Sequence, residues 1–504
     1  MGAHLAHNSA VGAASERWAP PNSMQDSPRL CGQLSIPKQY WDIKSSEMPA
    51  FVDIPYTKAI NVGETVCIRV VVPKNPYNAS MVFTPFSNTP WDSVLLDLVG
   101  VETGISIPVD LKLASDVRNY DKHSTHVYEA DVQLRDVDVY RPEGYVEYRD
   151  ALWNAEMPLD PQPFNPEPLY VSAALEVSAL DRYGNSTFSL SKYMDLPLCA
   201  ESNPEGRWVA GENLPFSAST LPHPDNHNRV WLPYNCRLQH ISYQSFAQCL
   251  IDKYPVVHFF GDSNMRRALK KITTLGEWCS TPEEQATAKC LCEDYRDSFE
   301  RFNVNSRNTI VDMDPIGGGH MPNGSFSLSA PPANKSRVFL RKWEGLVEAF
   351  SLDWKDAFRD TIGDVFGHPQ VIVLSLTNWD SAFSARAVFL RDVELLLGFI
   401  ESGYRPSTEI IIRTGQYYCC RSDTTPWKRR YSRLRNKAFD REIISAFHNR
   451  FNGTRSIRVW DVAAISEHRP YHARNQSLSC PSNHVRSEIV EVENQVLFNY
   501  MCNG

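Results

Sequence analysis

The stretch Tyr254-Pro-Val-Val-His-Phe-Phe-Gly-Asp-Ser263 decides the fold of the second half of the chain. A short apolar run ends at Gly261, and an amphipathic helical pattern begins at Asn264. This order predicts a buried strand, a tight turn and a helix. Ser263 lies at the turn, where the N-terminus of the helix favours developing negative charge.

The same rhythm of strand and helix recurs three times further along the chain. Apolar runs at 369–375, 409–413 and 456–460 are followed by helical patterns at 385–400, 429–451 and 485–500. Four such units predict an α/β domain whose parallel sheet is covered on both faces. Reactive groups gather at the carboxyl ends of the strands in such sheets. The rhythm is poor between 277 and 365, which we interpret as an insertion over the site.

The region 51–198 predicts an all-β domain. Val66, Ile68, Val70 and Val72 alternate with their neighbours, as in a half-buried strand, and Pro and Gly punctuate the later short strands. This spacing favours a β-sandwich, with a barrel as the alternative. Residues 1–50 are expected to be disordered or poorly structured, and no secretory signal is visible in 1–29. The predicted α/β domain covers 199–504.

The composition is that of a globular protein, with 42% hydrophobic and 22% charged residues among 504. The net charge of −8 gives no bulk attraction to nucleic acid or to an anionic membrane. No apolar run is long enough to span a membrane. A basic run, Trp427–Lys437, is interpreted as a solvated helix face, with a site for an acidic sugar or acyl donor as the alternative.

The 12 cysteines are even in number and lack the spacing of a zinc site, so we expect disulfides. Sequons for N-glycosylation occur at Asn78, Asn185, Asn323, Asn334, Asn452 and Asn475. Together these features predict a protein of the secretory pathway, in the Golgi lumen or outside the cell.

The hypothesis that Ser263 is a nucleophile requires a general base to activate its hydroxyl, and we expect this base at another strand-to-helix junction. His484 stands just before the last predicted helix, where it could reach Ser263. The alternatives are that Asp262 or Ser263 is only a helix N-cap and that His484 is polar surface.

Several motifs in fixed order accompany this pair. They are Gly206-Arg-Trp208, Trp231-Leu-Pro-Tyr-Asn-Cys236, Cys249-Leu and Gly261-Asp-Ser263-Asn-Met-Arg266, with a His and an amphipathic helix near the end of the chain. In this order the chain resembles the PC-esterase branch of the SGNH (GDSL-like) hydrolases. It is most similar to the neurexophilin and PC-esterase domain proteins, and is also similar to the trichome-birefringence-like acetyltransferases.

The resemblance implies a flavodoxin-like α/β/α SGNH domain preceded by an immunoglobulin-like sandwich. It also implies a Ser263 acyl-enzyme, with His484 as base and then acid. The oxyanion hole would use the Ser263 amide, a glycine for which Gly318 is our candidate, and Asn378. For Gly318 a plain flexible loop is the alternative.

The chain departs from the family at Pro481, where relatives often carry an Asp that orients the histidine. Asp461 is a possible substitute, and a Ser–His dyad is the alternative. Arg266 belongs to the resembling motif and either binds substrate or forms a structural ion pair.

The resemblance implies transfer or hydrolysis of an O-acyl group, usually acetyl, on a glycan or polysaccharide, with an acyl donor if the protein is a transferase. No metal or organic cofactor is expected. The alternative is a secreted binding protein with a degenerate esterase domain.

Overall fold

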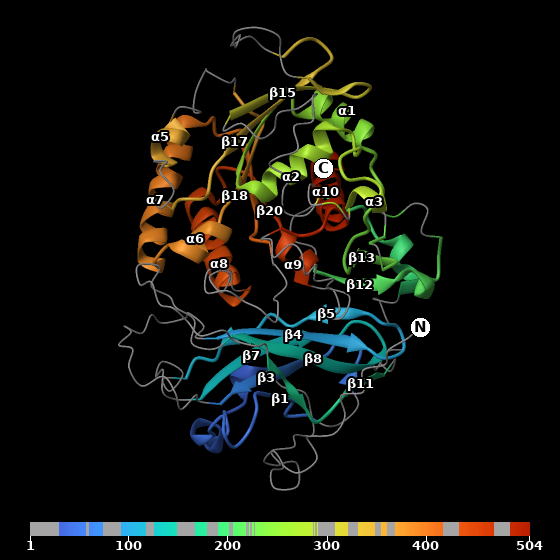
Figure 1. Cartoon of the computed structure of the whole chain (residues 1–504), viewed down its shortest axis with the longest axis vertical. Coiled ribbons are helices and arrows are strands. Elements are labelled where there is room, and N and C mark those ends of the chain that lie inside the picture. The colour runs from blue at the N-terminus through green and yellow to red at the C-terminus, as the bar shows by residue number, and fades with distance from the viewer. Residues whose placement is uncertain are drawn as a thin grey trace.

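The structure is a computed structural model. It describes residues 30–56, 60–73, 92–116, 125–148, 167–178, 190–200, 205–217, 221, 224–225, 227–285, 287, 290, 308–320, 331–347, 354–359, 368–416, 433–467 and 484–503. Within these residues the chain forms a β part and an α/β part, which follow one another along the long axis of the molecule (Figure 1).

Two sheets that share one hydrophobic core form the β part. Their strand orders are β10-β1-β3-β7-β6 and β13-β12-β5-β4-β8-β11-β2, with β9 paired to β8. Ile68 and Val70 of one sheet meet Leu96 and Leu98 of the other in the core, as the predicted alternation requires. The strands are β1 (Phe51–Asp53), β2 (Ile60–Asn61), β3 (Thr65–Val72), β4 (Ser93–Gly100), β5 (Ser106–Pro108), β6 (Lys112–Leu113), β7 (His126–Gln133), β8 (Asp138–Tyr148), β9 (Glu167–Pro168), β10 (Tyr170–Val171), β11 (Leu175–Ser178), β12 (Gly206–Ala210) and β13 (Arg229–Pro233).

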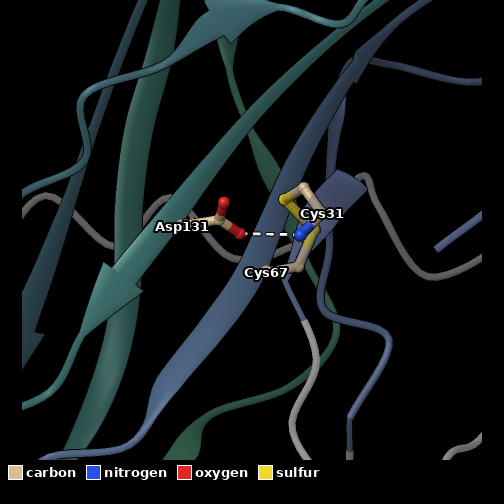
Figure 2. A group of neighbouring side chains, drawn as sticks. All are labelled: Cys31, Cys67 and Asp131. Atoms are coloured by element: carbon tan, nitrogen blue, oxygen red, sulfur yellow. Dashed lines mark hydrogen bonds between the residues drawn. A yellow bond between two sulfur atoms is a disulfide. The ribbon is translucent and has the colours of Figure 1, made fainter. Parts of the chain in front are cut away.

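Residues 30–50 belong to the β part, so the prediction of a poorly structured segment is wrong for them. Two 3-10 helices, η1 (Cys31–Gln33) and η2 (Lys38–Asp42), lie here. Tyr40 and Trp41 pack against Val71 in a small core of their own. A disulfide joins Cys31 to Cys67 of β3, and the Cys31 amide donates to Asp131 Oδ1 at 2.7 Å (Figure 2). These long-range contacts have no local pattern. Residues 1–29 lie outside the described part.

The hairpin β12–β13 lies between the two parts, beyond the predicted boundary at residue 198. Trp208 pairs with Ser106 of β5, which extends the eight-stranded sheet. Its side chain and that of Trp231 nevertheless enter the core of the α/β part, while Val209 and Leu232 enter the β core. Because side chains alternate along a strand, one hairpin serves both cores, and the boundary is a shared layer.

The α/β part is built on a seven-stranded sheet in the order β16-β15-β17-β14-β18-β19-β20. The strands from β17 to β20 in this order are parallel, and β15 and β16 add an antiparallel edge. The strands are β14 (Val256–Gly261), β15 (Asn308–Asp314), β16 (Gly318–His320), β17 (Ser336–Lys342), β18 (Val371–Ser375), β19 (Glu409–Arg413) and β20 (Ile457–Trp460).

Helices cover both faces of this sheet, as the sequence predicts (Figure 1). Val257 and Phe259 face the core formed with α1, α2, α9 and α10, and Phe260 faces the core formed with α5, α7 and α8. The helices are α1 (Tyr243–Lys253), α2 (Ser263–Thr273), α3 (Pro282–Gln285), α5 (Trp354–Arg359), α6 (Asn378–Phe383), α7 (Arg386–Gly403), α8 (Arg433–Phe451), α9 (Val462–Glu467) and α10 (Ser487–Cys502).

The predicted insertion at 277–365 supplies part of the sheet instead of lying wholly over the site. Its strand β17 is the parallel neighbour of β14 and brings Lys342 beside Gly261. The parallel strands therefore stand in the order second, first, third, fourth, fifth along the chain. The sequence did not predict this strand, because Arg337 and Arg341 interrupt its apolar pattern.

Four disulfides join eight of the 12 cysteines, which confirms the predicted disulfide set for the described residues. Besides Cys31–Cys67 they are Cys199–Cys236, Cys249–Cys502 and Cys279–Cys290. The remaining four, Cys292, Cys419, Cys420 and Cys480, lie outside the described residues.

The first turn of α8 docks onto the β part. Leu434 is buried in the β core, and Arg433 donates to the carbonyl oxygens of Val94 and Val109 at 3.5 and 3.1 Å. Arg433 and Arg435 are buried, so the interpretation of the basic run as a solvated face is wrong for them. The cost of burying these two guanidinium groups is offset by hydrogen bonds to backbone carbonyls, and for Arg435 the acceptor is the carbonyl of Ser384 at 2.9 Å. Residues 427–432 lie outside the described part.

Candidate active site

The turn between β14 and α2 presents Ser263 at the first position of a helix. Asp262 caps this helix, because its Oδ1 accepts from the Asn264 amide at 2.9 Å. Gly261 is required by close packing, since a Cβ there would lie 2.6 Å from Met265 Cβ and 2.9 Å from Ser375 Cβ. The N-cap alternative therefore applies to Asp262 and leaves the Ser263 hydroxyl available for another partner.

The structure brings the two predicted catalytic residues together. His484 Nε2 lies 2.7 Å from Ser263 Oγ, across 221 residues of sequence. His484 stands three residues before α10, and both side chains are half-buried. An imidazole at this distance can take the hydroxyl proton as the serine attacks an electrophile. Pro481 lies outside the described residues.

Asn378 is also near the nucleophile. It begins α6 at the carboxyl end of β18, and its Nδ2 donates to Asp262 Oδ2 at 3.4 Å. The turn before it is held by α8, where Asp440 accepts from Thr377 Oγ1 at 2.7 Å and from the Gly415 amide at 3.1 Å. This support matters because Thr377 has a φ of 73°, a region that β-branched residues rarely adopt.

Asp461 follows β20, as predicted, but its observed contacts are those of a helix cap. Its Oδ1 accepts from the Ala464 amide at 2.9 Å and from Thr414 Oγ1 at 3.1 Å. Ala464 is the third residue of α9, which is the amide that an N-cap side chain usually satisfies. These contacts hold the start of α9.

Gly318 is misplaced as an oxyanion donor. A Cβ on Gly318 would lie 2.8 Å from the carbonyl oxygen of Thr273, at the opposite end of α2 from Ser263. An 11-residue helix separates its two ends by about 15 Å. The reason is that Gly318 pairs with Asp314 at the end of β15. Because β15 is antiparallel to β17, this end lies beside Ser336, at the amino end of the parallel strands.

A different glycine, Gly345, follows the carboxyl end of β17, the parallel neighbour of the strand that ends before Ser263. The chain turns there directly beside the nucleophile strand, with the Trp343 amide donating to the Gly261 carbonyl at 3.0 Å. Gly345 has a φ of 77°, and a Cβ would lie 2.0 Å from Asp380 Oδ2. The signal for this residue is the run Ser336-Arg-Val-Phe-Leu, a strand pattern within the supposed insertion.

Arg266 lies one turn after Ser263 and is only 3% exposed. Its amide donates to the Asp262 carbonyl at 3.1 Å, within the helix. A side chain so deeply buried favours the structural alternative over contact with substrate.

A buried ion pair lies beneath the carboxyl ends of the central strands. Arg413 of β19 pairs with Glu493 of α10 at 2.9 Å, and both side chains are 0% exposed. Gln416 also donates to Glu493, at 2.7 Å. Burial raises the pKa of Glu493 even though Arg413 opposes this shift. The pair ties the sheet to the helix that follows His484.

Asp380 of α6 is a second buried acid close to the site. It accepts from the Leu346 amide at 2.8 Å and from the Thr377 amide at 3.3 Å. Burial raises its pKa to about 7, against the effect of these backbone donors. Asp380 thus links the Gly345 turn to the helix that begins with Asn378.

Among the described residues, one cluster has side chains of the metal-ligating type: Cys31, Cys67 and Asp131. The two sulfurs are bonded to each other (Figure 2), so neither is a thiolate that could bind an ion. None of the helices within the described ranges is long and apolar enough to cross a bilayer.

The chain matches none of the known protein-family models, and a search of curated proteins finds no significant match.

Proposed function

We propose that this chain is a serine-dependent O-acetyltransferase or O-acetylesterase of the SGNH type. The observation that carries the proposal is the 2.7 Å contact between His484 Nε2 and Ser263 Oγ at the N-terminus of α2. The order of the parallel strands supports it, because second-first-third-fourth-fifth is the flavodoxin-like order. The resemblance to the neurexophilin and PC-esterase domain proteins further leads us to propose that the preceding β part is an immunoglobulin-like domain.

In the proposed reaction, Ser263 Oγ attacks the acyl carbon while its proton moves to His484 Nε2. The tetrahedral intermediate collapses when the leaving alcohol takes that proton and departs. His484 then removes a proton from water or from a sugar hydroxyl, whose oxygen attacks the acyl carbon of the acyl-enzyme. The bond from that carbon to Ser263 Oγ breaks as His484 returns the proton to Ser263 Oγ. The acceptor decides between hydrolysis and transfer.

The oxyanion would be held at the start of α2. The Ser263 amide is suited to this role, because amides in the first turn of a helix have no partner within the helix. Asn378 Nδ2, beside Asp262, would be a second donor, and the turn at Gly345 replaces Gly318 as the source of a third. Asp461 caps α9 and remains the candidate for the acid that orients His484, with a Ser–His dyad as the alternative.

The glycan substrate and the acetyl group come from the family resemblance and are proposals. Four disulfides are compatible with a secreted or lumenal protein. We propose the Golgi lumen or the extracellular space as the compartment.

The test measures hydrolysis of p-nitrophenyl acetate and deacetylation of an acetylated polysaccharide. Ser263→Ala and His484→Ala should each lower turnover by roughly 10⁴-fold, as loss of a member of a catalytic unit does. Ser402→Ala on α7 and His448→Ala on α8 are matched controls, since both residues are exposed. Intact mass should show an acetyl adduct that is absent from Ser263→Ala, and sugar acceptors then distinguish transfer from hydrolysis. Activity that survives both substitutions would refute the mechanism. A wild type without activity on either substrate would favour the alternative, a secreted binding protein with a degenerate esterase domain.

A further inference from the structure

The segment that follows α2 folds back beneath the helix and is closed by a disulfide. Cys279 is joined to Cys290, and both are buried together with Trp278, which is 0% exposed. Leu275, Gly276 and Cys279 have φ angles of 51°, 90° and 53°. Left-handed conformations at non-glycine residues persist where the surroundings hold them in place. We call Trp278, Cys279 and Cys290 the helix clamp.

The helix clamp contacts both helices that carry the catalytic pair. On α10, Ser487 Oγ donates to the Cys279 carbonyl at 3.1 Å. On α2, Arg267 Nη2 donates to the Cys290 carbonyl at 2.6 Å. Ser487 is three residues after His484, and Arg267 is four residues after Ser263. Each contact thus lies about one helical turn from a catalytic residue.

Cationic side chains of α2 pack on the same clamp. The Arg267 guanidinium lies 5.5 Å from the centre of the Trp278 ring, and Lys270 Nζ lies 5.7 Å from it. Cation–π contacts at buried rings are stronger than at exposed ones because the charge is desolvated. They fix the clamp against α2 independently of the hydrogen bond to Cys290.

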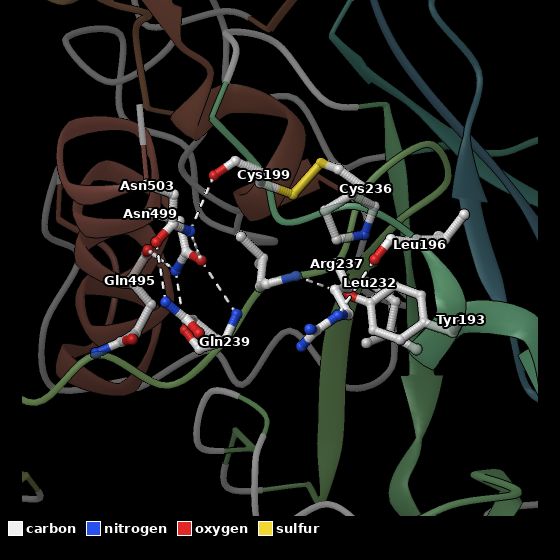
Figure 3. The surroundings of a disulfide bond; sticks show 12 residues. Tyr193, Leu196, Cys199, Leu232, Cys236, Arg237, Gln239, Gln495, Asn499 and Asn503 are labelled. Carbon is white, nitrogen blue, oxygen red and sulfur yellow. Dashed lines mark hydrogen bonds between the residues drawn. A yellow bond between two sulfur atoms is a disulfide. The ribbon is translucent and has the colours of Figure 1, made fainter.

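The opposite end of α10 has anchors of its own. Cys502 is joined to Cys249 of α1. Asn499 exchanges hydrogen bonds with the backbone of Gln239, and Asn503 donates to the Cys199 carbonyl at 3.1 Å (Figure 3). These contacts lie about 20 Å along the helix from Ser487, at 1.5 Å per residue. Because they are so far away, the first turn of α10 is aligned by the contacts that it makes itself. One of these is the hydrogen bond from Ser487 to the Cys279 carbonyl.

We propose that the Cys279–Cys290 disulfide is a positioning device for the Ser263–His484 pair. It holds one loop against Arg267 and Lys270 of α2 and against the first turn of α10, so that the hydroxyl and the imidazole stay within hydrogen-bonding distance. The inference rests on the proposed function for its catalytic consequence, but its structural consequence can be measured separately.

The experiment replaces both cysteines, Cys279→Ser with Cys290→Ser, and compares this variant with Cys31→Ser plus Cys67→Ser in the β part. The clamp closes a sequence separation of 11 residues and the control one of 36. Loss of the longer loop costs more stability in the chain-entropy account. If the Cys279–Cys290 disulfide only stabilises the fold, the control should lose at least as much stability and at least as much labelling rate as the clamp variant.

The catalytic readout is the rate at which a fluorophosphonate probe labels Ser263, forming an Oγ–P bond with loss of fluoride, measured against pH and well below the melting temperature. Loss of the clamp should slow labelling by about 10²-fold, the size expected for a misplacement of about 1 Å, while the control stays near the wild-type rate. Ser487→Ala removes one contact and keeps the disulfide, with Ser466→Ala of α9 as its matched control; it should slow labelling to a smaller extent.

A second readout does not depend on catalysis. Hydrogen exchange should become faster in the peptide 484–490 when the clamp is removed, and remain unchanged near Cys502. Unchanged exchange in 484–490 would overturn the inference, whether or not the protein is an enzyme. If the wild type takes no label, the proposed function fails and the exchange data still decide the role of the clamp. If the wild type is labelled and the clamp variant reacts equally fast, the positioning role fails alone.

Discussion

Replacing Asp380 by Asn should remove a dependence of stability on pH that this one buried group creates. Asp380 is 0% exposed, and burial raises its pKa from 3.8 to about 7. The folded protein therefore binds this proton more tightly than the unfolded chain does. The stabilisation is fully present below pH 3.8 and is lost as the pH rises through about 7.

The magnitude follows from the two pKa values. Their difference is about 3 pH units, and each unit corresponds to about 1.4 kcal/mol. The free energy of unfolding of the wild type, relative to Asp380→Asn, should thus fall by about 4 kcal/mol between pH 4 and pH 8. Asparagine has nearly the same size and keeps one acceptor oxygen, so at least one of the Leu346 and Thr377 amides keeps its hydrogen-bond acceptor.

The assay is urea unfolding of both proteins at several pH values, with the difference between them taken at each pH. Other titrating groups cancel in this difference because both proteins contain them. Asp252→Asn, at an exposed position on α1, is the control and should show no such trend. A difference between wild type and Asp380→Asn that is constant from pH 4 to pH 8 would refute the reasoning.

Three further substitutions test the site. Asn378→Ala should lower turnover on p-nitrophenyl acetate by about 10²–10³-fold if its amide stabilises the oxyanion; a change in KM alone would contradict that role. Gly345→Ala should lower the melting temperature, because the φ of 77° and the Cβ position 2.0 Å from Asp380 Oδ2 both oppose a side chain. Gly398→Ala in α7 is its control, since that Cβ meets nothing within 4 Å, and should be neutral or stabilising. Arg413→Met leaves Glu493 buried without its cation and should cost about 3–5 kcal/mol in the free energy of unfolding; urea unfolding checks this, and an Arg413→Met, Glu493→Gln double variant should recover part of the loss.

Local patterns were sufficient where the partners are near in sequence or the period is regular. The apolar run before Gly261, the alternation in β3 and the helical periods of α7 and α10 are all visible in the sequence. The placement of Ser263 and His484 at strand-to-helix junctions followed from the same patterns, together with a family resemblance.

Other features have no local signal. β17 was hidden by its two arginines, and Gly345 with it. The edge strand β16 drew attention to Gly318 because a glycine run is conspicuous, although the antiparallel pairing carries it to the wrong end of α2. Asp461 follows a strand end as predicted, and it also caps α9, because its carboxylate accepts from the Ala464 amide three residues later.

The sequence by itself determined the periodicities, and these specify which residues become strands and helices. A buried face recurs every second residue in a strand and about every 3.6 residues in a helix. Only the tertiary structure decided which strands are neighbours, which cysteines pair and which side chains meet across 221 residues. Such contacts depend on the packing of whole layers, and a one-dimensional pattern carries no information about which faces come together.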